Sequence, residues 1–158
     1  MKTLVVYDSV FGNTKRIAET IAKTIPKSKL VSSKKTNLAQ LKNLDLLIVG
    51  SPTYGGRPTT AILNFLNKIN NGSLKKIKIA AFDTRFSKKN HGLGLKILMN
   101  MIGFAAPKTT KSLIAKGGTQ IVEPQGFIVK SKEGPLEPKE VKKAETWAGK
   151  ILKKIKSQ

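Results

Sequence analysis

Short apolar runs alternate with segments of helical periodicity along the whole chain, and this alternation constrains the fold more than any other feature. Continuous apolar runs are typical of strands buried on both faces, whereas apolar residues spaced three and four apart indicate helices. We expect strands over residues 4–7, 30–31, 44–50 and 77–82. A last strand is predicted over residues 119–122 and 127–129, interrupted at Pro124 because proline cannot donate a ladder hydrogen bond.

The helices predicted between these strands follow the same reasoning. Apolar spacing favours helices over residues 17–25, which Pro26 ends, and over residues 62–69 and 95–102, with a single turn at 38–41. A further helix is expected over 107–116, and an amphipathic helix over 141–155 closes the chain. We expect Trp147 to pack in the core rather than to contact a ligand.

Five strands that alternate with helices predict an α/β fold, a doubly wound parallel sheet with helices on both faces. No linker, repeat or low-complexity stretch divides the chain, so residues 1–158 are expected to form a single domain. In such sheets ligands bind beyond the carboxyl ends of the strands, where the winding direction reverses. The loops after the first, third and fourth strands are therefore the place to search for a site.

The loop after the first strand has the features of a phosphate site. It carries the polar side chains of Ser9, Asn13 and Thr14 around Gly12 and leads directly into a helix, whose unpaired amides favour an anion. The alternative is that these side chains only cap the helix. The chain contains neither the P-loop pattern nor a complete dinucleotide-binding Gly-x-Gly-x-x-Gly, which argues against those two classes of nucleotide site.

Composition excludes several kinds of chemistry. The chain has no cysteine and one histidine, so a disulfide framework, a cysteine nucleophile and a thiolate-held metal are excluded, and a metal site held by the protein is not expected. No apolar run approaches the length of a membrane span or a signal peptide, which predicts a cytoplasmic protein without membrane insertion.

The formal net charge is +21, and 27 of the 30 basic residues are lysines. Dispersed lysine without arginine forks or stacking aromatics argues against specific nucleic-acid recognition. Two interpretations stay open: a solvated lysine coat that reflects compositional bias, or electrostatic steering toward acidic proteins, nucleic acid or anionic lipid.

Two loops together resemble those of the flavodoxin family: residues 7–14, Tyr-Asp-Ser-Val-Phe-Gly-Asn-Thr, and residues 50–56, Gly-Ser-Pro-Thr-Tyr-Gly-Gly. The resemblance extends over essentially the whole chain and implies a flavodoxin-like fold that binds FMN. It implies that the first loop holds the FMN phosphate through Ser9, Gly12, Asn13, Thr14 and the backbone of Val10 and Phe11. Phe11 departs from the family pattern, because many flavodoxins have a threonine there.

The same resemblance implies that the second and third loops hold the flavin ring. Tyr54 is expected to stack on the ring, with Phe86 as a second stacking candidate, and each has the alternative of packing on the protein itself. Asp83 and Thr84 are expected at the pyrimidine edge, and a positive Arg85 nearby would stabilise the anionic reduced flavin. His91 is either a solvated loop residue or a contact at the flavin edge. The remaining predicted ring contacts come from the second loop: Ser51, Pro52, Thr53, Gly55 and Gly56.

The function expected from these observations is electron transfer by a noncovalently bound FMN, in one- or two-electron steps, with no catalytic side chain. Acidic docking surfaces are expected on its redox partner proteins, because the chain is strongly basic. Two alternatives stay open: an FMN-dependent NAD(P)H:quinone or nitro reductase, and a flavin-free basic module that binds nucleic acid or acidic lipids.

Overall fold

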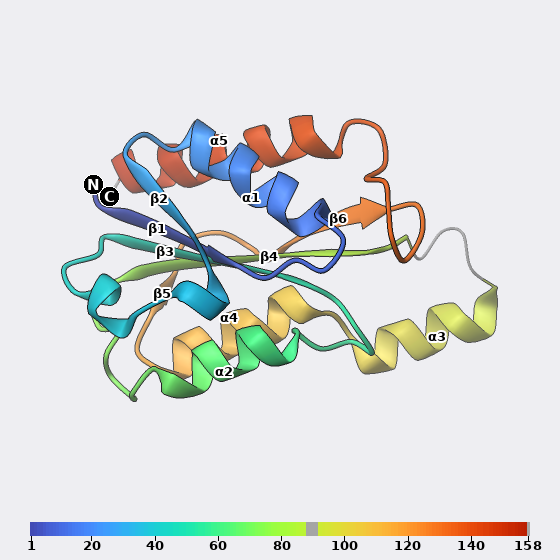
Figure 1. The fold of residues 1–158 in the computed structure, drawn as a ribbon, viewed down its shortest axis with the longest axis horizontal. Coiled ribbons are helices and arrows are strands. Elements are labelled where there is room, and N and C mark those ends of the chain that lie inside the picture. Colours follow the sequence, from blue (N-terminus) through green and yellow to red (C-terminus); the bar gives the residue numbers. More distant parts are fainter. Residues whose placement is uncertain (88–91, 158) are drawn as a thin grey trace.

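A computed structural model of the protein describes residues 1–87 and 92–157. Its centre is a parallel β-sheet with the strand order β2-β1-β3-β4, and both β5 and β6 lie along the outer edge of β4 (Figure 1). The strands are β1 (Thr3–Tyr7), β2 (Ser28–Ser32), β3 (Leu46–Pro52), β4 (Lys78–Phe86), β5 (Thr119–Gln120) and β6 (Gln125–Val129). The predicted doubly wound parallel sheet is confirmed.

Helices cover both faces of this sheet. Helices α1 and α5 lie on one face, and α2 and α4 lie on the other (Figure 1). The helices are α1 (Asn13–Thr24), α2 (Thr60–Lys68), α3 (Leu93–Ile102), α4 (Ala105–Ala115) and α5 (Glu140–Lys156). Two short 3₁₀ turns, η1 (Ser33–Lys35) and η2 (Leu38–Leu41), follow β2.

Alternating side chains of the central strands divide the core into two layers. Val5 and Ile48 face α1 and α5, whereas Leu4, Val6 and Leu47 face α2 and α4. Every residue of β3 is buried, as a strand covered on both faces requires. Trp147 is a core residue, as predicted, and its ring makes edge contacts with Phe82 and Phe127.

Several boundaries differ from those predicted. Strand β3 ends at Pro52 and β4 ends at Phe86, so polar residues expected in loops belong to strands. The reason is pairing: Ser51 and Pro52 lie opposite Asp83 and Thr84, and β6 pairs with β4 from Phe82 to Phe86. Helix α4 begins two residues earlier than expected, at Ala105.

The interruption predicted at Pro124 divides the last strand into two elements. Strand β5 pairs with Lys78 and Ile79 near the start of β4, and β6 pairs with its end. The sheet therefore has five parallel strand positions, and two short strands share the last one.

The loops that follow β1, β3 and β4 lie together at the carboxyl end of the sheet. Helix α3 also lies at this end and extends beyond the body of the molecule (Figure 1). Both chain termini lie at the other end of the sheet (Figure 1).

Candidate functional site at the carboxyl end of the sheet

The loop between β1 and α1 presents backbone amides rather than a capped helix end. Gly12 precedes the helix with φ of 87°, a left-handed conformation that glycine adopts without a steric penalty. Its N–H donates to the Ser9 hydroxyl at 3.1 Å, so Ser9 closes the loop rather than capping the helix. No side chain caps α1, and within the described residues the amides of Asn13, Thr14 and Lys15 have no acceptor. An anion at this end of α1 would be stabilised by these amides and by the helix dipole.

The other polar side chains of this loop are engaged within the protein. The Asn13 side-chain amide donates to the carbonyl of Glu133 at 3.0 Å, which joins the loop to the turn after β6. The buried hydroxyl of Thr14 lies 2.8 Å from that of Thr84 on β4. These two contacts fix the position of the loop against the sheet.

The second loop forms a tight turn. Tyr54 and Arg57 exchange backbone hydrogen bonds, and Gly55 and Gly56 between them both have positive φ. A Cβ on Gly56 would collide with Ile102 of α3, so the turn packs directly against that helix. Ser51 is buried and accepts a hydrogen bond from the Thr59 N–H at 3.0 Å, which fixes the start of α2.

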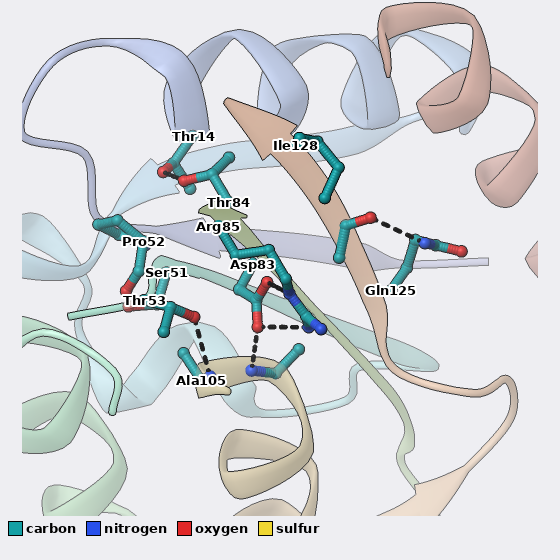
Figure 2. Close-up of polar contacts among 12 residues, drawn as sticks. Thr14, Ser51, Pro52, Thr53, Asp83, Thr84, Arg85, Ala105, Gln125 and Ile128 are labelled. Atoms are coloured by element: carbon teal, nitrogen blue, oxygen red, sulfur yellow. Dashed lines mark hydrogen bonds and ion pairs between the residues drawn. The ribbon is translucent and has the colours of Figure 1, made fainter. Parts of the chain in front are cut away.

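Asp83 and Arg85 form a buried ion pair on the α4 side of the sheet (Figure 2). The guanidinium donates to both oxygens of the Asp83 carboxylate, and the Ala106 N–H donates to one of them at 2.7 Å. Burial raises the pKa of Asp83, while the hydrogen bond and the charge of Arg85 act in the opposite direction. The guanidinium also stacks on Phe104, with its central carbon 3.7 Å from the ring centroid.

Thr84 projects to the opposite face of β4 from this ion pair, because successive strand residues alternate (Figure 2). Asp83 and Thr84 are both expected at the pyrimidine edge of a flavin, and their side chains lie on opposite faces of β4; the predicted contacts stay predictions.

Most of the predicted site residues line one hollow at the carboxyl end of the sheet. Five that the structure describes do not line it: Gly12, Ser51, Gly55, Gly56 and Asp83. Tyr54 and Phe86 are about two-fifths exposed there, at 39% and 40%, and Phe11 and Val10 are also exposed. Burial raises the pKa of Tyr54, and the nearby Asp8 raises it further. The residues lining the hollow are Ser9, Val10, Phe11, Asn13, Thr14, Pro52, Thr53, Tyr54, Thr84, Arg85, Phe86, Val129 and Lys132. His91 lies outside the described residues.

Sequence reasoning missed Lys132, which brings a positive charge to this hollow from the turn after β6. The rule that carboxyl ends of parallel strands meet at one edge applies to the last strand as well. Applied to residues 130–135, it would have brought Lys132 into the candidate set.

Comparisons with known proteins agree on one family. A family model described as "Flavodoxin domain" matches residues 4–113. The chain belongs to the flavodoxin family. No curated protein matches it.

Solved flavodoxin structures share the fold over nearly the full length. Flavodoxin 2 from Bacillus cereus is 21% identical with a TM-score of 0.77, over 98% of this chain and 99% of that one. A flavodoxin from the domain Archaea is 22% identical with a TM-score of 0.74, over 99% of each chain. The rubredoxin oxygen:oxidoreductase of Desulfovibrio gigas is 20% identical with a TM-score of 0.74, over 99% of this chain but 36% of that larger protein.

Proposed function

We propose that this flavodoxin-family protein binds FMN noncovalently at the carboxyl end of the sheet and carries electrons between redox proteins. The observation that carries the proposal is the uncapped amino end of α1, which faces the hollow beside two exposed aromatic rings, Tyr54 and Phe86. FMN has the matching chemistry, a phosphate anion joined to a planar aromatic ring. When bound, it supplies the capacity to accept and release one or two electrons.

The unpaired backbone amides of Asn13, Thr14 and Lys15 would hold the phosphate together with the Ser9 hydroxyl and the backbone of residues 10 and 11, with Lys132 contributing charge. Asn13 would act through its bond to Glu133, which positions the loop. Tyr54 and Phe86 would cover the ring and exclude water from it. The cofactor contacts predicted for the individual residues stay predictions.

The ion pair changes the role that we propose for Asp83 and Arg85. The Asp83 carboxylate accepts hydrogen bonds from Arg85 and from the Ala106 N–H. We therefore propose that Asp83 holds β4 in position against α4. Because Asp83 compensates the charge of Arg85, the pair would act on a reduced flavin as a dipole rather than as a full positive charge.

Titration of the protein with FMN, followed by flavin fluorescence and absorbance, tests the proposal. The variant K15E places a carboxylate in the first turn of α1, where it repels a phosphate. It also removes the exposed Lys15–Glu19 ion pair, which contributes little to stability. We expect it to weaken FMN binding by about three- to tenfold and to leave binding of riboflavin, which lacks the phosphate, unchanged.

The matched control is K23E, the same charge change in the last turn of α1. It should leave FMN affinity within about twofold of the parent protein, since the charge lies a helix length from the hollow. Equal effects of K15E and K23E, or equal loss of riboflavin binding, would contradict a phosphate at this helix end.

The reduction step separates the proposed carrier from the alternatives. A carrier holds oxidised FMN until a reductase is added, whereas direct bleaching by NAD(P)H indicates the quinone or nitro reductase. Absence of binding at micromolar FMN indicates the flavin-free module. The acidic partner surface and the cytoplasmic location stay predictions.

A further inference from the structure

Helix α3 has exposed apolar side chains on two sides. Its inner side chains, Leu95, Leu98, Met99 and Ile102, line a cavity with the turn of residues 54–56 and Phe104. The outer stripe, defined as Leu93, Ile97 and Met101, is 75%, 51% and 80% exposed. These three residues are spaced by four and therefore share one face of the helix. A helix at a protein surface normally turns polar residues outward, so α3 is anomalous.

The helix stands away from the body of the molecule. It extends past the end of the sheet (Figure 1), and none of its residues is buried. Its carboxyl end is attached, since Ile102 packs against Gly56 and the Lys108 ammonium donates to the Ile102 carbonyl at 2.7 Å. The outer stripe is therefore a convex apolar ridge.

The segment that carries α3 is basic, and its described basic residues nearest the ridge are Lys96 on α3, Arg57 beside the turn packed on α3, and Lys108 at the start of α4. Residues 46–122 contain 12 lysines and arginines and a single acidic residue, Asp83. Asp83 has no exposed surface and is paired with Arg85. No exposed carboxylate therefore belongs to α2, α3 or α4, or to the described loops between them.

From this combination of an apolar ridge and a basic surround, we propose that α3 docks on an anionic lipid surface. The outer stripe would enter the boundary between headgroups and acyl chains, and the surrounding lysines would face the anionic headgroups. The docking is peripheral, because no helix of the described residues is long and apolar enough to cross a membrane. It departs from the sequence-based expectation that the protein does not insert into a membrane at all.

Charge argues against a second copy of the chain as the occupant, and shape favours lipid over a protein partner. A second copy of the chain carries the same net charge of +21, so self-association would bring like charges together. A convex ridge needs a complementary groove on a protein partner, whereas fluid lipid accommodates side chains without one. The proposal does not depend on FMN, so its failure and that of the proposed function are separate outcomes.

Vesicle flotation tests the proposal, with vesicles of phosphatidylcholine alone and vesicles with added phosphatidylglycerol. At an ionic strength of roughly 0.15 M, which screens charge beyond about 8 Å, we expect binding to the phosphatidylglycerol vesicles only. The variant I97S/M101S should lower the partition coefficient at least about tenfold, because each side chain loses its apolar burial in the lipid. Its melting temperature should not change, since both side chains are exposed in the free protein.

The matched control is L38S/I114S, which removes two exposed apolar side chains from η2 and α4. It should bind the vesicles as the parent protein does. Equal binding by both variants would show that charge alone holds the protein on the vesicles and would overturn the role of α3. Absence of vesicle binding by the parent protein would also overturn the proposal. A dimer in light scattering that I97S/M101S dissociates would identify a second copy as the occupant. If I97S/M101S binds the vesicles as the parent protein does but transfers electrons more slowly to an acidic protein, the occupant is a protein partner instead.

Discussion

At the scale of single residues, Asp83 is a buried charge held by groups of the protein itself. Its carboxylate has no exposed surface and is held by Arg85 and by the Ala106 N–H, so it ties β4 to α4 directly under the candidate site. Removing one partner of such a pair leaves the other charge uncompensated. We expect D83N to lower the free energy of unfolding by about 2 to 4 kcal/mol, measured by urea denaturation.

The surface pair Lys142–Glu145 is the control for this prediction, because its side chains are 79% and 43% exposed. E145Q should cost less than about 1 kcal/mol. The double variant D83N/R85M should recover part of the loss, since it removes the orphaned charge as well. If D83N and E145Q have equal effects, the buried pair does not stabilise the fold as argued.

At the scale of elements, one glycine of β3 makes room for an aromatic ring of β4. Gly50 lies opposite Phe82 in the sheet, and a Cβ on Gly50 would occupy the position of the Phe82 ring. We expect G50A to destabilise the protein by about 1 to 3 kcal/mol through overpacking. The same change in α5, G149A, meets no neighbour and should stabilise by about 0.5 to 1 kcal/mol. Thermal unfolding of both variants checks the prediction, and shifts of the same sign would refute it.

The elements also show where sequence reasoning succeeds and where it stops. Strand β1 and the first loop could be predicted, because an unbroken apolar run followed by small polar residues and Gly12 is a local signal. The end of β4 could not be predicted, because Asp83 and Arg85 have the composition of a loop and become strand residues through pairing with β3 and β6. Periodicity identified the inner side of α3 but carried no information on whether anything covers its outer stripe.

At the scale of the whole molecule, we expect the net charge of +21 to act on encounters with charged molecules. Once FMN is bound and reduced, its reoxidation by small ions of known charge measures the field near the hollow. We expect the rate with anionic ferricyanide to fall as ionic strength rises, and the rate with cationic hexaamminecobalt(III) to rise. Stopped-flow measurements over a salt series check both slopes. Two flat slopes would show that the lysine coat does not act on electron exchange.

The position of the two termini has a practical consequence. Both lie at the end of the sheet where the strands begin, away from the hollow and from α3 (Figure 1). A tether attached to either terminus, whether a linker to another domain or an anchor on an electrode, would leave the hollow and α3 facing away from the attachment point. Attachment through a terminus would therefore leave the proposed FMN site accessible to a redox partner.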